Sequence, residues 1–153
     1  MLFRSANDTL IVRGDYNIGI ATDTNDGLVV PVMKEVDRLS MIDIAKEISR
    51  LSTAARDRKL SLDDLRGGTF TITSAGSIGG LFATPIINYP EVAIMGVHKI
   101  KERPIIKNGE ITKGYIMYLS MSLDHRIIDG ADAAYFMNEV VAYLEDPKRL
   151  LLA

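Results

Sequence analysis

The sequence predicts an α+β fold in which the strands form a mixed sheet and the helices pack on one face of it. Three observations lead to this expectation. The chain has 153 residues, of which 47% are hydrophobic and 25% charged, as expected of one compact domain with its own core. Short runs of strand composition are separated by turn signals, and two longer stretches repeat apolar residues at helical spacing. No repeat or linker interrupts residues 1–153, so we expect a single domain.

The first half of the chain predicts a strand hairpin followed by a helix. Strand composition occurs in residues 9–13, 16–22 and 28–33. An Asn-Asp-Gly turn at 25–27 joins the last two runs as a hairpin. Ser40 is the expected N-cap of a helix, because an acidic residue follows three positions later and apolar residues then recur at helical spacing as far as Ala55. A short second helix is expected from Ser61 to the paired glycines that follow.

The second half predicts the rest of the sheet and one more helix. Residues 69–74 alternate strictly, with Phe70 and Ile72 facing one way and three threonines facing the other. The remaining expected elements are a buried strand at 91–97, a hairpin turn at Asn108-Gly109, a long strand at 115–123 and a helix at 131–145 that ends at Asp146-Pro147. The glycine-rich stretch at 75–80 lacks the Lys-Ser/Thr of a phosphate-binding loop and predicts a connection.

Composition excludes several classes of function. Cysteine is absent, which rules out disulfides, thiolate zinc sites and a cysteine nucleophile, and we expect no metal. The net charge is −2 and the basic residues are thinly spread, so we expect no nucleic-acid partner. No apolar run approaches the length that spans a bilayer, so we expect no membrane partner. Thiol chemistry would therefore depend on thiols that the substrates carry.

The most informative segment is residues 122–130, S-L-D-H-R-I-I-D-G. An apolar strand ends there in a charged loop, and such a cluster is either a structural ion-pair network or an active site. A histidine side chain can accept a proton at neutral pH, so His125 can act as a general base, or it can simply form a hydrogen bond at the strand end. Asp129 can orient the His125 ring or pair with Arg126, and the structural alternative is a helix N-cap.

The motif H-x-x-x-D-G resembles the chloramphenicol acetyltransferase superfamily, and D-H-R-I-I-D-G-A resembles its dihydrolipoamide acyltransferases. Further matches in the same order are Y-N-I-G-I-A-T-D-T, D-G-L-V-V-P-V, G-G-T-F-T-I-T-S, P-I-I-N-Y-P-E-V-A-I-M-G-V and E-D-P-K-R-L-L-L. The resemblance covers nearly the whole chain from about Asp8 onward. It implies the two-layer sandwich of that superfamily, with a mixed sheet and helices on one face.

The resemblance also implies a mechanism. His125 would deprotonate a thiol of coenzyme A or dihydrolipoamide, and the thiolate would attack the thioester of the other substrate. The hydroxyl of Thr73 would stabilise the resulting oxyanion, whereas a solvent-facing role suits Thr69 and Thr71 better. Asp129 would organise the loop through an ion pair. Asp124 is a minor candidate, for which simple solvation is the default interpretation.

Coenzyme A contacts follow from the same resemblance. Asp23 matches an aspartate that lies near coenzyme A, and Ser74 matches a second contact. Thr53, beside Ser52, lies in the helix that lines the channel. His98 could border the coenzyme A side, although a lone histidine at a strand end is more often structural.

The resemblance implies a larger assembly. The family's domain begins with a further helix and strand, so we expect a chain truncated at its N-terminus, without lipoyl or peripheral subunit-binding domains. The lipoyl group would be carried on a separate lipoyl domain. Homotrimers would build a cubic or dodecahedral core, joined through the tail at 150–153, alongside decarboxylase and dihydrolipoamide dehydrogenase components. His125 of one subunit would meet Thr73 of its neighbour. The compartment would be bacterial or archaeal cytoplasm, or the mitochondrial matrix.

Two alternatives remain open at this stage. One is an assembly scaffold fragment without activity, and the other is a chloramphenicol-type O-acetyltransferase that acylates a hydroxyl. The acyl group is also open, because the motifs resemble acetyl, succinyl and branched-chain enzymes alike.

Overall fold

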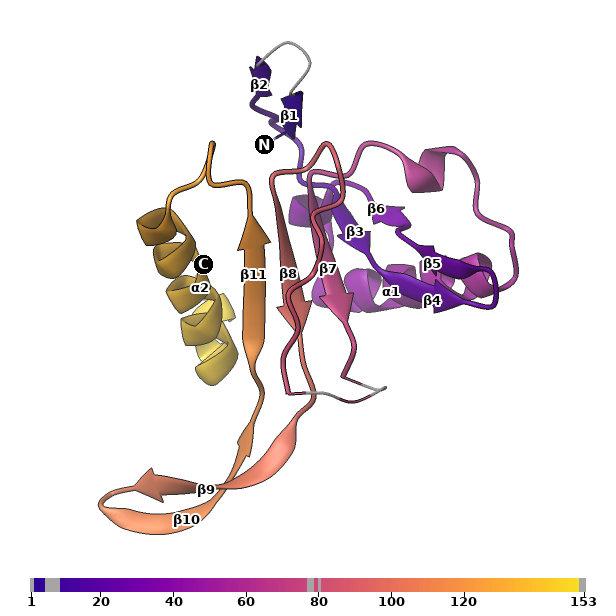
Figure 1. The fold of residues 1–153 in the computed structure, drawn as a ribbon. Coiled ribbons are helices and arrows are strands. Elements are labelled where there is room, and N and C mark those ends of the chain that lie inside the picture. The colour runs from indigo at the N-terminus through magenta and orange to yellow at the C-terminus, as the bar shows by residue number, and fades with distance from the viewer. Residues whose placement is uncertain (1, 5–8, 77–78, 80, 152–153) are drawn as a thin grey trace.

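The computed structural model describes residues 2–4, 9–76, 79 and 81–151, and its centre is a five-stranded mixed sheet (Figure 1). The strand order is β11-β8-β7-β3-β6. The strands are β3 (Ile18–Ile20), β6 (Val32–Met33), β7 (Phe70–Ser74), β8 (Ala93–Val97) and β11 (Leu119–Leu123). The three central strands β3, β7 and β8 run parallel, and the two edge strands are antiparallel to their neighbours.

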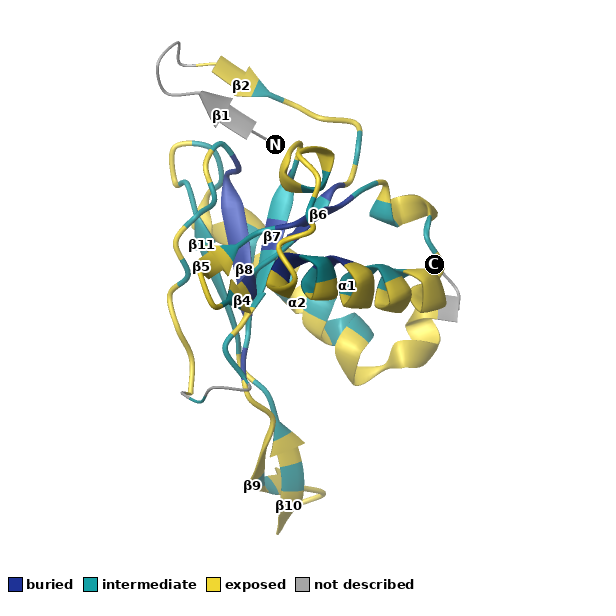
Figure 2. Cartoon of the chain, turned by 90° about the vertical axis from the view of Figure 1, so that its right-hand side faces the viewer, coloured by how far each residue is buried: buried dark blue, intermediate teal, exposed yellow. Residues whose placement is uncertain are grey.

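Two α-helices lie on the same side of this sheet, α1 (Met41–Arg56) and α2 (Gly130–Glu145) (Figure 2). Residues 81–90, called the strap below, run along the other side. The mixed sheet with helices on one face confirms the predicted α+β class. Ser40 is the N-cap of α1, where its Oγ accepts the amide of Asp43 at 3.2 Å, as the sequence predicts. Leu51 and Ala55 are the buried residues of α1.

The remaining strands form three hairpins. They are β1 (Leu2–Arg4) with β2 (Thr9–Ile11), β4 (Thr22–Thr24) with β5 (Gly27–Val29), and β9 (Lys101–Lys107) with β10 (Glu110–Ile116). The β9–β10 hairpin projects away from the sheet (Figure 1). Its turn confirms the sequence signal, because Asn108 and Gly109 both have positive φ, at 55° and 83°. Among the described residues, 3₁₀ helices cover Val36–Arg38, Asp63–Leu65 and Pro147–Leu151.

Three strand predictions need correction. The run expected at 28–33 is divided, because β5 pairs with β4 while β6 pairs with β3. The run expected at 115–123 is divided, because β10 pairs with β9 while β11 pairs with β8, and the chain changes partner at residues 117–118. There the carbonyl of Tyr118 accepts the amide of His98 at 3.1 Å. The run expected at 16–22 is likewise divided between β3 and β4, and the helix expected after Ser61 is a single 3₁₀ turn. Residues 77, 78 and 80 of the glycine-rich stretch at 75–80, and residues 152 and 153 of the tail at 150–153, lie outside the described residues.

The solvent-facing role expected for Thr69 and Thr71 is wrong. Their exposed fractions are 9% and 0%, because the strap side of the sheet is covered. Each hydroxyl is bound inside the protein. Thr71 donates to Glu91 Oε2 at 2.7 Å, and Thr69 donates to the carbonyl of Asn17 at 2.9 Å while accepting its amide at 3.1 Å. Buried hydroxyls require such partners.

The Asn17 side chain joins three segments of the first half. Its amide group donates to Asp15 and to the carbonyl of Gly67, both at 2.8 Å. Its oxygen accepts the amide of Glu35 at 2.9 Å, and Asn17 itself is 6% exposed. One residue therefore holds the end of the β2–β3 connection against the segments that lead into α1 and β7.

Replacing Asn17 by alanine should destabilise the fold, because two backbone groups lose their partners in a partly buried site. The expected cost is about 2 to 4 kcal/mol in the free energy of unfolding. Chemical denaturation measures it, with Asn25→Ala in the exposed β4–β5 turn as the control, which should change stability by less than about 0.5 kcal/mol. Equal effects of the two substitutions would contradict this role for Asn17.

Candidate active site

His125 is presented on a turn that Asp124 organises. The amide of Asp124 donates to the carbonyl of Val92 at 2.8 Å, which ties the turn to the start of β8. The carbonyl of Asp124 accepts the amides of Ile127 and Ile128 at 2.9 and 3.0 Å. These bonds close the turn immediately after β11 and leave the His125 side chain exposed at its apex.

Asp124 also forms an ion pair across His125. Its carboxylate accepts Nε of Arg126 at 2.9 Å and Nη2 at 2.6 Å, and the backbone amide of Arg126 at 3.1 Å. Hydrogen bonding to Arg126 lowers the pKa of Asp124 to about 2. Simple solvation, the default expectation for Asp124, is therefore wrong, because the carboxylate binds the side chain of Arg126.

Asp129 is the N-cap of α2, which was the structural alternative to a role in orienting His125. Its Oδ1 accepts the amide of Asp132 at 2.9 Å. The ion pair that the structure shows in this loop joins Arg126 to Asp124. The side chain of Asp129 thus fixes the point where the His125 loop enters α2, and a carboxylate is favourable at a helix N-terminus.

Thr73 lies in β7, opposite Gly96 of β8, and is half-buried. Within the part of the chain that the structure describes, its hydroxyl has no hydrogen-bond partner. The hydroxyls of Thr69 and Thr71 on the same face of the strand are both occupied. Of the three threonines, Thr73 is therefore the one whose hydroxyl is available to a ligand.

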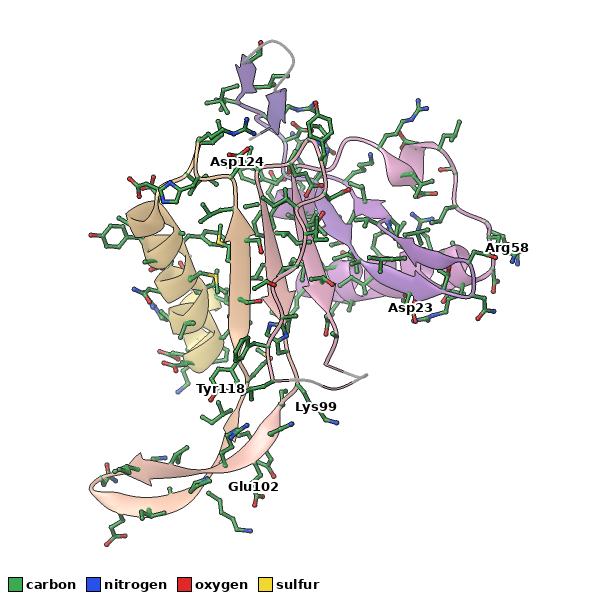
Figure 3. The ribbon with its side chains drawn as sticks, in the orientation of Figure 1. Asp23, Arg58, Lys99, Glu102, Tyr118 and Asp124 are labelled. Atoms are coloured by element: carbon green, nitrogen blue, oxygen red, sulfur yellow. The ribbon has the colours of Figure 1, made fainter. Side chains whose placement is uncertain are left out.

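The residues expected to contact coenzyme A lie toward the same end of the sheet as Thr73. Ser74 follows Thr73, is exposed, and accepts the amide of Gly76 at 3.4 Å. Asp23 lies in β4 and lines a hollow of about 290 Å³ with Thr24, Asn25 and Arg56. Thr53 is exposed on α1, one helical turn before Arg56. Figure 3 shows Asp23 and Arg58 at the β4–β5 edge of the molecule, away from Asp124.

His98 follows β8 and is 7% exposed. Its Nε2 lies 2.8 Å from Ser120 Oγ, and the Ser120 hydroxyl donates to the carbonyl of Ala83 at 2.6 Å. Nε2 of His98 also accepts the backbone amide of Ala83 at 3.4 Å, so His98 and Ser120 both contact the strap at Ala83. His98 and Ser120 together hold the strap on the sheet, next to the row that contains Thr73 and Gly96.

The candidate catalytic residues lie at opposite ends of the sheet. In the strand register Thr73 is aligned with Gly96, and Gly96 with Ser120. His125 follows the other end of β11, beyond Leu123. Figure 3 shows Asp124 at one end of the sheet and Tyr118 with Lys99 at the other. Leu123 lies three residue steps after Ser120 along β11, and β7 and β11 are two strand spacings apart. These displacements alone separate the backbone positions of Thr73 and the end of β11 by more than roughly 13 Å. Within one chain, His125 and Thr73 therefore cannot act on one carbonyl group.

Sequence reasoning missed two contributors to this geometry. One is the pairing of Asp124 with Arg126, for which the alternation of opposite charges around His125 was the available signal. The other is Glu91, which is buried at the start of β8. Its signal was a single charged residue immediately before the apolar run V-A-I-M-G-V.

Comparison with known proteins identifies the family. The profile of the 2-oxoacid dehydrogenases acyltransferase (catalytic domain) matches residues 2–152. The succinyltransferase component of the 2-oxoglutarate dehydrogenase complex from Bartonella vinsonii subsp. berkhoffii is 49% identical, over 94% of this chain and 35% of that protein. The acetyltransferase component of the pyruvate dehydrogenase complex from Staphylococcus aureus (strain Mu50) is 49% identical, over 98% of this chain and 35% of that protein. The chain thus spans about a third of the length of these relatives.

Solved structures agree with the profile. The dihydrolipoamide acetyltransferase of Azotobacter vinelandii matches with a TM-score of 0.92 and 40% identity, over 98% of this chain and 62% of that one. A truncated catalytic core of the 2-oxoacid dehydrogenase multienzyme complex from Thermoplasma acidophilum matches with a TM-score of 0.85 and 50% identity, over 95% of this chain and 64% of that one. The chain belongs to the family of acyltransferase catalytic domains of 2-oxoacid dehydrogenases.

The Azotobacter structure is described as a study of a serine, a histidine and an asparagine in the catalytic mechanism. The histidine lies 52 positions after the serine, and the asparagine four positions after the histidine. Another structural neighbour, with a TM-score of 0.91, is the cubic core of a pyruvate dehydrogenase multienzyme complex.

In the present chain, none of the helices that the structure describes has the length and apolar character needed to cross a membrane. Within the same residues, no group of three or more His, Cys, Asp or Glu side chains is arranged to hold a metal ion.

The ion pair at the base of the His125 turn gives a pH prediction. Because the folded-state pKa of Asp124 is depressed to about 2, its contribution to stability is present above the unfolded pKa of about 3.9 and is lost as pH falls through about 2. Carboxyl NMR of the folded protein should follow Asp124 to a midpoint near 2, and Arg126→Gln should return the midpoint toward about 3.9. A midpoint near 4 that does not change with this substitution would show that the ion pair between Asp124 and Arg126 does not form in solution.

Proposed function

We propose that this chain moves an acyl group between a dihydrolipoyl thiol and coenzyme A as the catalytic core of a 2-oxo acid dehydrogenase complex. The observation that carries the proposal is a match of spacing. Thr73, His125 and Asp129 stand 52 and four positions apart, as do the serine, histidine and asparagine of the Azotobacter enzyme. Thr73 keeps the hydroxyl, and Asp129 places a carboxylate where that enzyme has an amide.

The chemistry begins at His125. A neutral imidazole accepts the proton of the attacking thiol, and the thiolate adds to the thioester carbonyl of the other substrate. The tetrahedral intermediate carries its negative charge on oxygen, toward which the unoccupied hydroxyl of Thr73 donates a hydrogen bond. The intermediate then collapses, the second thiol leaves as a thiolate, and the proton on His125 returns to it. No acyl group becomes attached to the protein.

The active unit requires two copies of the chain. His125 and Thr73 lie at opposite ends of one sheet, so His125 of one copy must act with Thr73 of another. A homotrimer provides three such sites by cyclic symmetry, and trimers could build a cubic or dodecahedral core. The cubic core of the neighbouring pyruvate dehydrogenase supports that assembly. Decarboxylase, dihydrolipoamide dehydrogenase and a lipoyl domain would be the partners that supply and reoxidise the lipoyl group.

The substrates would reach the shared site from two sides. Asp23, Ser74 and Thr53 lie toward the Thr73 end of the sheet, and we assign coenzyme A to this side. Lipoyl thiol would enter from the side of the neighbouring His125 turn. No metal takes part in this chemistry, because the thiol and the imidazole supply both the nucleophile and the base.

The direct test is thioester formation from acetyl-, succinyl- or isobutyryl-coenzyme A with dihydrolipoamide. His125→Ala should lower kcat by about 10² to 10⁴ through loss of the general base. Thr73→Val should lower kcat by about 10² to 10³, and Thr73→Ser, the matched control that keeps a hydroxyl, should stay within roughly tenfold of wild type.

Two outcomes would overturn the proposal. Wild-type protein that transfers none of the three acyl groups while forming large particles would favour a scaffold without activity. Acetylation of a hydroxyl acceptor such as chloramphenicol, in preference to dihydrolipoamide, would favour the O-acetyltransferase alternative.

A further inference from the structure

Glu91 is a buried carboxyl group that joins three segments at the His125 end of the sheet. It is 5% exposed. Its Oε2 accepts the hydroxyl of Thr71 at 2.7 Å, and its Oε1 accepts the side-chain amide of Asn88 at 3.3 Å. Its own backbone amide donates to the carbonyl of Asn88 at 2.9 Å. A Cβ at Gly68 would lie 2.5 Å from Oε1, so the carboxyl packs directly against that backbone.

Structural ion pairing does not explain why a carboxyl group is buried here. The ion pairs formed among the described residues do not include Glu91. Burial raises its pKa, and the hydrogen bonds from Thr71 and Asn88 offset part of that effect. Burying a carboxyl group is costly, and its two oxygens accept hydrogen bonds from Thr71 and Asn88. Its geometry therefore points to a role in holding backbone segments together.

The segments that Glu91 joins carry the catalytic turn. The next residue, Val92, provides the carbonyl that accepts the amide of Asp124 at 2.8 Å. Asp124 in turn closes the His125 loop through its carbonyl and holds Arg126 through its carboxylate. A shift of the β8 start would therefore move the base of the turn on which His125 stands.

We propose that Glu91 is a positioning residue for His125, acting through the hydrogen bond between Val92 and Asp124. Thr71 and Asn88 fix the Glu91 side chain from β7 and from the strap, and this fixes the backbone position of Val92. The inference rests on the proposed acyl-transfer function, because it assigns Glu91 to the geometry of that site. Glu91 itself does not contact the substrates.

The test compares two substitutions of Glu91 in the assembled protein. Glu91→Ala leaves the Thr71 hydroxyl and the Asn88 amide without acceptors, and kcat should fall about 10- to 100-fold with KM nearly unchanged. Glu91→Gln keeps an oxygen for Thr71, and the Asn88 amide can turn to present its own oxygen. This variant should retain kcat within about threefold and the wild-type pH profile, since Glu91 is not the titrating base.

Asn17→Ala is the matched control for destabilisation. Asn17 is an equally buried polar residue, but none of its hydrogen bonds reaches the His125 turn. With all variants assayed at the same interval below their own Tm, Asn17→Ala should keep the wild-type kcat. An equal loss of kcat in Asn17→Ala and Glu91→Ala, or a Glu91→Gln variant as slow as Glu91→Ala, would overturn the positioning role.

A measurement without catalysis separates this inference from the proposed function. Hydrogen exchange of residues 119–128, followed by mass spectrometry, should be faster in Glu91→Ala than in Asn17→Ala, because the amide of Asp124 loses a fixed acceptor. Unchanged exchange there would refute the link between Glu91 and the turn even if acyl transfer is observed. Conversely, faster exchange in a protein without any transferase activity would sustain the link and reject the function.

Discussion

The antiparallel pairing of β11 with β8 is the constraint on which the site depends. Because β8 runs parallel to β7, the reversal at β11 sends the chain back to the end of the sheet where β7 begins. β11 ends at that end of the sheet and β7 ends at the other (Figure 1). The His125 turn follows β11, and Thr73 lies near the end of β7. The same hydrogen bonds that make the sheet stable therefore divide the candidate site into two halves, and only association of copies can reunite them.

The polar face of the sheet explains why, among the described residues, one of three threonines has a hydroxyl without a hydrogen-bond partner. The hydroxyl of Thr69 is bound to Asn17 and that of Thr71 to Glu91, and both side chains are buried under the strap side. Thr73 lies two residues further along β7 and is aligned with Gly96, which has no side chain to offer a polar partner. Internal hydrogen bonding thus fixes the strand, and in the proposed function the Thr73 hydroxyl is the donor to a developing negative charge.

Local features of the fold could be predicted from sequence, and features set by distant pairing could not. The Ser40 cap, the Asn108-Gly109 turn and the helix after Asp129 carry their signals in adjacent residues. The break between β10 and β11 depends on which strand each half pairs with. The burial of Thr71 depends on the covering of its face of the sheet by the strap, which is distant in sequence. The candidate site residues were recognisable by motif, but the pairing of Asp124 with Arg126 and the role proposed for Glu91 appear only once the turn is built on β8.

The central claim is that His125 and Thr73 act from different copies, and subunit mixing tests it most directly. Differently tagged Thr73→Val and His125→Ala chains, each nearly inactive alone, are co-assembled in equal amounts, and mixing is verified by mass spectrometry. Random assembly should restore about a quarter of wild-type transfer, since a site works when it draws an intact His125 and an intact Thr73 from neighbouring subunits. Mixed assemblies that are no more active than the two variants alone would mean that each chain holds both residues of its own site, and would contradict the account.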